Sequence, residues 1–183
     1  MKRYLGYVIG FALIFIIGNS IYEYNKKMDM YKKSYRLDCH KKMTSFERVY
    51  DINKIKAIQK MLLTGNYTLT SSIQKSVYAK SKLFDFVKLD KMDKITLETL
   101  KSYSKKMEQS DSALKISYYI YENDIKDPGK KTEKSKSYAG YVVFKFKDEN
   151  DELIYQSQID FMDKKGADLP QSIECAIESF TTY

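Results

Sequence analysis

An uncharged, mostly apolar stretch between Arg3 and Glu23 constrains this chain more than any other feature. About 19 helical residues at ~1.5 Å each roughly match the ~30 Å hydrocarbon core of a bilayer. Tyrosines lie near both ends, as in the aromatic belt of a spanning helix: Tyr4, Tyr7, Tyr22 and Tyr24. The sequence therefore predicts a membrane anchor over residues 1–22, a single-pass protein at the cell membrane, and the lipid bilayer as a partner.

A cleavable secretory signal is the second interpretation of this segment. A basic start, an apolar stretch over residues 5–17, and the small residues Gly18 and Ser20 would suit a signal peptidase. Against cleavage, the large residues Ile21 and Tyr22 continue the apolar character beyond that site. The third interpretation is a helix buried in a soluble domain. We favour the uncleaved anchor.

Basic residues around the apolar stretch bear on its orientation. Lys2 and Arg3 precede it, and five bases follow it: Lys26, Lys27, Lys32, Lys33 and Arg36. A count of bases alone keeps the following side in the cytoplasm, but long domains are translocated largely regardless of charge. We therefore expect an extracytoplasmic body. The five bases are candidates for contact with anionic lipid headgroups, with a solvated lysine-rich helix as the alternative.

Composition restricts the rest of the chain to one ordinary domain plus a connecting segment. A hydrophobic content of 43%, with only two prolines and seven glycines, excludes a disordered or low-complexity chain. The net charge is +8, yet residues 148–183 hold nine acidic residues against two lysines. That acidic end would suit a basic surface of a partner protein. No nucleic acid is expected, because the lysines are dispersed and no binding motif accompanies them.

The two cysteines, Cys39 and Cys175, lie near the two ends of the body. In an exported chain they suggest one disulfide closing a loop of about 137 residues, and the alternative is two free thiols. A bridge would tie the segment after the anchor to the C-terminal helix. Cys39 and His40 do not suggest a metal site, because neighbours on a helix point about 100° apart and His40 is the only histidine.

Residues 23–66 show a helical pattern. Apolar side chains recur at steps of three and four: Tyr24, Met28, Tyr31, Tyr35, Cys39, Met43, Phe46 and Tyr50. This spacing predicts that the membrane helix continues into a long amphipathic helix. Asp51 would cap a second helix that ends at Gly65, and together the two helices would form a helical stalk.

Residues 67–183 are expected to form an α+β domain. Its first part is ambiguous, with a possible short strand over 67–70 and a helix that Asp93 would cap. Farther on, alternation predicts three strands, with inner faces at Leu114, Ile116, Tyr118, Ile120; at Tyr138, Gly140, Val142, Phe144, Phe146; and at Leu153, Tyr155, Ser157, Ile159, Phe161. Asp168 and Pro170 would start the last helix. The predicted fold is a small domain with a three-stranded antiparallel meander covered by helices.

No motif for chemistry is present. The acidic turn at residues 148–152 lacks the order of a calcium loop and is interpreted as a hairpin tip. Neither a nucleophile elbow nor a phosphate-binding glycine pattern occurs, so no catalytic, cofactor or metal site is expected. We expect a non-catalytic protein that binds another protein, as an envelope-complex subunit or an immunity or inhibitor factor does. The alternative is a cleaved, secreted protein that binds an anionic polymer or membrane surface through its basic N-terminal helix.

Overall fold

The computed structural model describes residues 15, 17–24, 37–105 and 113–183 of the chain. The chain divides into two compact units, Met1–Leu37 and Asp38–Tyr183, and each is described by itself. In the first unit, residues 15 and 17–24 are helical with exposed side chains.

The expected membrane anchor is corrected by the structure. Within the described residues, no helix has the length and apolar character needed to cross a membrane. The single-pass anchor, and the cell-membrane location inferred from it, are therefore not supported. Most of the segment that carried this prediction, residues 1–14 and 16, lies outside the described residues.

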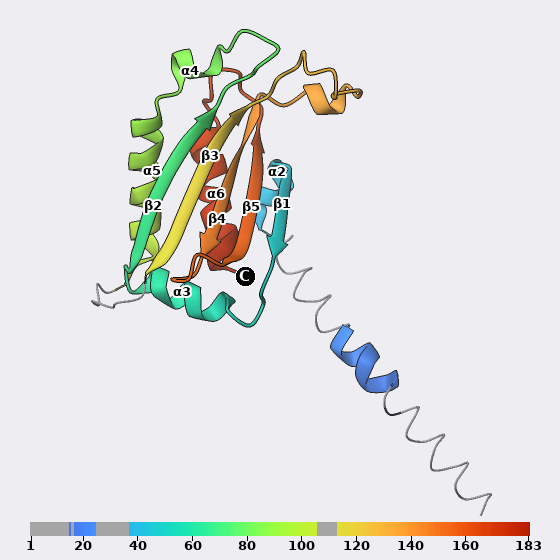
Figure 1. Cartoon of the computed structure of the whole chain (residues 1–183), viewed down its shortest axis with the longest axis vertical. Coiled ribbons are helices and arrows are strands. Elements are labelled where there is room, and N and C mark those ends of the chain that lie inside the picture. The colour runs from blue at the N-terminus through green and yellow to red at the C-terminus, as the bar shows by residue number, and fades with distance from the viewer. Residues whose placement is uncertain (1–14, 16, 25–36, 106–112) are drawn as a thin grey trace, which may run out of the picture. The chain divides into compact units, whose positions relative to one another are not determined.

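The second unit is built on one five-stranded sheet with the strand order β1-β5-β4-β3-β2 (Figure 1). The strands are β1 (Ser45–Val49), β2 (Tyr67–Gln74), β3 (Leu114–Glu122), β4 (Gly140–Lys147) and β5 (Leu153–Phe161). All neighbours are antiparallel except β2 and β3, which run parallel. The expected three-stranded meander is therefore too small, because β1 and β2 extend it on both sides into a mixed sheet.

The prediction of a long amphipathic helix is also wrong. After the short helix α2 (Asp38–Lys42), the chain forms β1, which pairs with β5 from Ser45 opposite Ile159 to Val49 opposite Tyr155. The apolar residues of this segment match a helical spacing, but the segment forms a strand. Alternate residues of β1 accordingly point to opposite faces of the sheet. Residues 25–36 of the predicted stalk lie outside the described residues.

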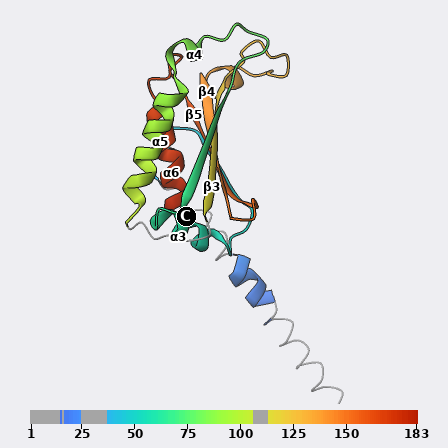
Figure 2. The same ribbon diagram turned by 60° about the vertical axis from the view of Figure 1, so that its left-hand side comes forward.

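Helices cover one face of the sheet (Figure 2). They are α3 (Ile55–Leu63), α5 (Leu89–Tyr103) and α6 (Leu169–Thr181). The short helix α4 (Leu83–Phe86) and the 3₁₀ turn η1 (Lys134–Lys136) lie in the connections at one end of the sheet (Figure 1). Between the parallel strands β2 and β3, α4 and α5 supply the crossover that such a pair requires.

The sequence predicted aspartates at the starts of three helices. One of these predictions is confirmed, and the other two are wrong. Asp168 is the N-cap of α6, with Pro170 in its first turn. Asp51 lies before α3 rather than at its cap, and its carboxylate accepts the Asn53 N–H. Asp93 lies inside α5, where it accepts a hydrogen bond from the Tyr118 hydroxyl at 2.6 Å. A tertiary contact thus uses the side chain that the sequence suggested as a cap.

The core lies between the sheet and these helices. Phe146 of β4 stacks on Phe180 of α6 with ring centroids 3.9 Å apart, and both side chains are fully buried. Burial of an aromatic side chain of this size stabilises a fold by about 1.5–3 kcal/mol. The packing therefore fixes α6 on one side of the sheet, and residues 38–105 and 113–183 place no helix on the other side.

Candidate functional site

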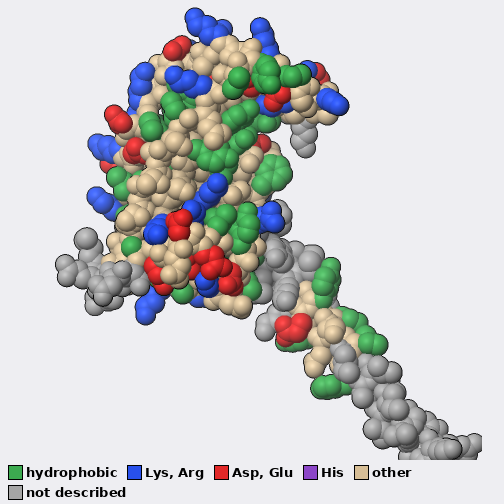
Figure 3. All heavy atoms as spheres, viewed as in Figure 1, with side chains coloured by type: hydrophobic (Ala, Val, Ile, Leu, Met, Phe, Trp, Pro, Cys, Tyr) green, Lys and Arg blue, Asp and Glu red, His purple; other side chains and the backbone are tan. Residues whose placement is uncertain are grey.

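The face of the sheet opposite the helices is turned toward the viewer in Figure 3, and none of the labelled helices α3, α5 and α6 covers it. Its side chains alternate along each strand with those that enter the core. We call this surface the open face, and its main residues are Phe46, Arg48, Lys115, Tyr119, Tyr121, Tyr141, Lys145, Lys147 and Asp160.

Four tyrosines form a cluster on the open face. Tyr121 and Tyr141 stack with centroids 4.5 Å apart, and Tyr119 meets the Tyr141 ring edge-on at 6.3 Å. Tyr138, just before β4, lies 6.3 Å from Tyr141. Burial, together with the neighbouring tyrosines and Asp160, raises the pKa of the Tyr141 hydroxyl. The cluster therefore presents neutral, packed rings with polar tips at neutral pH.

Two lysines approach this tyrosine cluster. The Lys130 ammonium lies 5.3 Å from the ring centroid of Tyr121 and 5.6 Å from that of Tyr138. The Lys145 ammonium lies 5.9 Å from the centroid of Tyr119. All three distances are within the ~6 Å range of cation–π attraction. Lys130 comes from the loop after β3, so the sheet and a loop build the cluster together.

The open face is basic. Arg48 and Lys145 lie on it without an acidic side chain within ion-pair distance among the described residues, and Lys147 contacts Asp151 at 3.1 Å at the end of the sheet. Asp160 is the acid near the tyrosines, and burial raises the pKa of its carboxyl despite a hydrogen bond from Gln158. The partner chemistry that fits this face is therefore acidic rather than basic.

The acidic turn at residues 148–152 is largely neutralised within the molecule. Lys54 contacts Asp148 at 2.9 Å and Glu152 at 2.5 Å. The hydrogen bond from Lys54 is the main reason that the pKa of the Asp148 carboxyl falls below its ordinary range. The turn thus joins the β4–β5 hairpin to the start of α3, which is a structural role.

Other acids of the C-terminal segment line a groove between α5 and α6. It has a volume of about 680 Å³, and its lining includes Glu98, Glu174, Glu178 and Tyr103. These carboxylates face solvent, and acidic groups on a helical surface commonly do so without a ligand. We assign no site to the groove.

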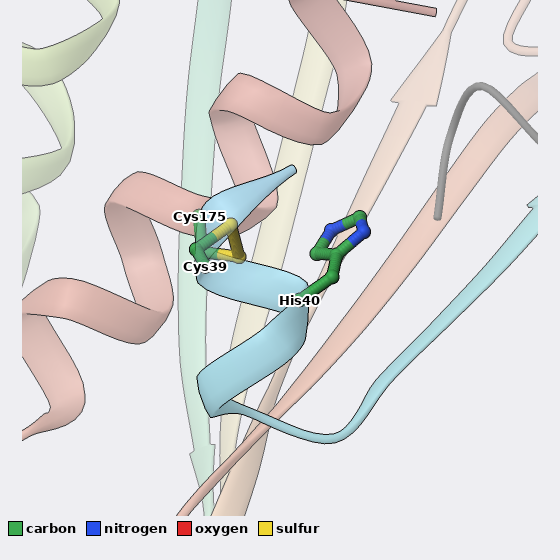
Figure 4. Close-up of side chains that lie close together, drawn as sticks. All are labelled: Cys39, His40 and Cys175. Atoms are coloured by element: carbon green, nitrogen blue, oxygen red, sulfur yellow. A yellow bond between two sulfur atoms is a disulfide. The ribbon is translucent and has the colours of Figure 1, made fainter. Parts of the chain in front are cut away.

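A second polar cluster lies under α2. A disulfide joins Cys39 of α2 to Cys175 of α6, with Cα atoms 5.9 Å apart, and His40 follows Cys39 (Figure 4). The structure thus brings the two sequence-predicted cysteines together. Ligand atoms of these three residues lie within 4.8 Å of one another, but each sulfur is bonded to the other. Neither sulfur is a thiolate that could coordinate a metal ion.

His40 lies in a buried network with residues from three other elements. Its Nε2 lies 2.6 Å from the Ser179 Oγ and 3.8 Å from the Glu47 Oε1. The Tyr155 hydroxyl donates to the same Glu47 oxygen at 2.7 Å. The side chains of His40 and Glu47 are 3% and 5% exposed. The network therefore links α2, β1, β5 and α6 beneath the surface.

This network differs from a Ser–His–acid catalytic triad. In a triad the acid holds Nδ1 of the histidine while the serine donates its proton to Nε2. Here Ser179 and Glu47 both approach Nε2, and the Ser179 hydroxyl donates instead to the Cys175 carbonyl at 2.7 Å. Nδ1 of His40 is buried and has no hydrogen-bond partner among the described residues. The arrangement positions secondary structure rather than activating a nucleophile.

Sequence reasoning found only part of these sites. The five basic candidates for lipid contact at positions 26–36 lie outside the described residues. Tyr138, which the alternation pattern assigned to the inner face, belongs instead to the tyrosine cluster. Glu47 was missed because its segment was interpreted as helical. The signal that could have found the open face was the alternation of Tyr119 and Tyr121 with buried residues on β3.

Comparisons with known proteins carry no argument about the fold or the function of this chain. No protein-family profile and no curated protein match the chain. Among solved structures, it is similar to the PelC dodecamer from Paraburkholderia phytofirmans, with 10% identity, a TM-score of 0.41, and coverage of 76% of this chain and 97% of that one. A single-substitution PelC variant from the same organism gives 9% identity, a TM-score of 0.42, and coverage of 77% and 99%. A likeness of this size carries no argument about function.

Proposed function

We propose that this protein is a non-catalytic binding module whose open face docks on an acidic surface of another protein. The observation that carries the proposal is the tyrosine cluster, which is flanked by lysines and covered by no helix of its unit. It replaces the earlier expectation that the acidic end of the chain meets a basic partner, since Lys54 already pairs with two of those acids.

The chemistry of the open face suits protein recognition. Tyrosine and arginine are enriched at the energetically important centres of interfaces. The rings of Tyr121 and Tyr141 are already held against each other, so docking would cost little side-chain entropy. Phe46 adds an apolar side chain that is 58% exposed on the neighbouring edge strand.

The positive charge of the open face favours an acidic partner over a basic one. Lys145 and Arg48 lie on the open face, and Lys130 lies beside its tyrosines. Complementary charge on a partner would speed association and select against basic surfaces. An anionic polymer shares that negative charge, and we treat its binding as an outcome of the test rather than as a second proposal.

The test compares two double variants of the full chain in affinity purification with cross-linking. Tyr119→Ala with Lys145→Glu alters the open face. Leu97→Ala with Lys101→Glu makes matched changes at exposed positions of α5. We expect the wild type and the α5 variant to retain one protein partner, with cross-links to acidic segments of that partner, and the open-face variant to bind it at least about tenfold more weakly.

Three results would overturn the proposal. The first is equal retention of the partner by the two double variants. The second is a partner whose cross-linked segment is basic. The third is recovery of an anionic polymer in place of a protein. Circular dichroism of both variants supplies the control for folding, because every substituted side chain is at least partly exposed.

A further inference from the structure

Exposed apolar side chains gather in the loops at one end of the sheet. β2, β3 and β5 end there and β4 begins there, since Glu122 pairs with Gly140 and Gly140 with Phe161. The loops carry five large apolar side chains that are 53–84% exposed: Val77, Tyr78, Phe86, Ile125 and Met162. We call this group the loop tips. Single exposed apolar residues need no explanation, but several at one end of a domain do.

Buried carboxylates hold these loops in place. Asp124 accepts hydrogen bonds from the backbone N–H groups of Val77 at 2.6 Å and Tyr78 at 2.5 Å. Glu122 accepts the N–H groups of Lys82 at 2.8 Å and Leu83 at 2.9 Å. The side chains of Val77 and Tyr78 are therefore presented to solvent on a backbone that the core fixes.

Contacts between the loops hold the loop tips together on one surface. The Lys165 ammonium lies 5.5 Å from the ring centroid of Phe86, which connects the loop after β5 to α4. Gly166 packs so closely on Val87 that no side chain would fit at its position. Asp124 connects the loop after β3 to the loop after β2.

Lysines surround the loop tips. Those that are exposed are Lys75, Lys80, Lys82, Lys88, Lys126, Lys131, Lys164 and Lys165. Several acids of the same loops are turned toward backbone N–H groups: Asp168 accepts that of Met162 at 2.7 Å, and Asp163 accepts that of Lys165 at 2.8 Å. In Figure 3, Lys and Arg side chains accordingly gather with hydrophobic ones at the end where α4 lies.

We propose that the loop tips dock on an anionic lipid surface, with the apolar side chains entering the headgroup region and the lysines contacting lipid phosphates. A bilayer interface accepts apolar side chains of any shape and attracts each nearby lysine. A folded protein would instead need a separate pocket for each projecting tip, such as the 84% exposed Val77. This contact is peripheral and needs no spanning helix. It uses a different surface from the open face, so it does not rest on the proposed function.

The absence of tryptophan from the chain permits a local test in the full-length protein. Tyr78→Trp places the only fluorophore of its kind at a loop tip, where the native side chain is 61% exposed. Tyr50→Trp is the matched control, because Tyr50 is 45% exposed and follows β1 at the opposite end of the sheet. The probe reports its own surroundings, so binding through another part of the chain affects the two variants alike.

Each variant is mixed with vesicles of equal parts phosphatidylglycerol and phosphatidylcholine, and with vesicles of phosphatidylcholine alone. We expect the emission of the probe at position 78 to shift to shorter wavelength, and to be quenched by brominated acyl chains, only with the anionic vesicles. High salt should reverse the shift. Adding Lys80→Glu and Lys82→Glu should reduce the partition constant for the anionic vesicles by at least about fivefold per lysine.

Either of two results would overturn the inference. One is a probe at position 78 that shows no shift with anionic vesicles. The other is an equal shift of the probe at position 50, which would indicate that lipid contact is not specific to the loop tips.

Discussion

Cys39 and Cys175 are separated by 136 positions in the chain, yet their Cα atoms lie 5.9 Å apart across a disulfide. The bond joins a five-residue helix to a thirteen-residue one. No residue of α2 is buried as a whole, but the His40 side chain is 3% exposed and lies 2.6 Å from the Ser179 Oγ of α6, and the disulfide adds a covalent link between the two helices. The disulfide therefore fixes the N-terminal end of the unit over residues 38–183.

Replacing both cysteines by serine should lower the free energy of unfolding by about 2–4 kcal/mol, because the unfolded chain loses the constraint of a long closed loop. Urea denaturation of the oxidised wild type and of the double variant measures the difference. The sheet should remain folded in the variant at low urea, since its core contacts with α6 do not involve the bridge. Unchanged stability, or two fully reactive thiols in the oxidised wild-type protein, would contradict this account.

Tyr155→Phe tests the buried network around His40. The change removes the hydroxyl that donates to Glu47 and leaves a carboxylate with 5% exposure short of a donor. We expect a loss of about 1–3 kcal/mol in the free energy of unfolding. Tyr50→Phe removes a hydroxyl from an exposed ring and should change stability by less than about 0.5 kcal/mol. Equal effects of the two substitutions would show that the Glu47 contact contributes nothing.

The loop after β2 should respond to acid through Glu122. Burial raises the pKa of the Glu122 carboxyl, but hydrogen bonds from Leu83, Lys82, Ser76 and Ser81 outweigh it and hold the pKa below the ordinary 4.5. The lowered pKa contributes stability that is fully present above about pH 4.5, and this contribution is lost as the pH falls through the folded-state value.

Glu122→Gln should remove this part of the acid dependence. Urea denaturation at several pH values below about 5 should give a shallower fall in stability for the variant than for the wild type. Glu133→Gln, at an exposed position of the loop before η1, supplies the control and should leave the profile unchanged. Parallel profiles for wild type and Glu122→Gln would reject the role of this carboxylate.

The sequence predicts secondary structure best in segments where the apolar residues follow a single period. On β3, every second residue is buried, and its strict alternation identifies both a strand and the outward position of Tyr119. On β1, Phe46 and Tyr50 are exposed and happen to match a helical spacing with Met43, so the local pattern favours the wrong structure. Only pairing with β5, more than a hundred residues away, decides the structure of that segment.

The candidate site depends even more on long-range contacts. Lys130 reaches Tyr121 and Tyr138 from a loop whose path no periodicity describes. The pairing of Lys54 with the acidic turn likewise joins segments more than ninety positions apart. Composition therefore suggested an acidic binding end, whereas in the folded chain Lys54 pairs with two of those acids and the open face presents a basic, tyrosine-rich surface.

Site-specific photo-cross-linking tests the central claim most directly. A photoreactive phenylalanine replaces Tyr119 on the open face in one full-length variant and Leu97 on α5 in a matched one, and both are irradiated in the cells that make the protein. The account predicts a cross-link from position 119 to an acidic segment of one partner protein and none to that partner from position 97. Cross-linking of the same partner from position 97 but not from position 119, or no protein cross-linked at position 119, would contradict it.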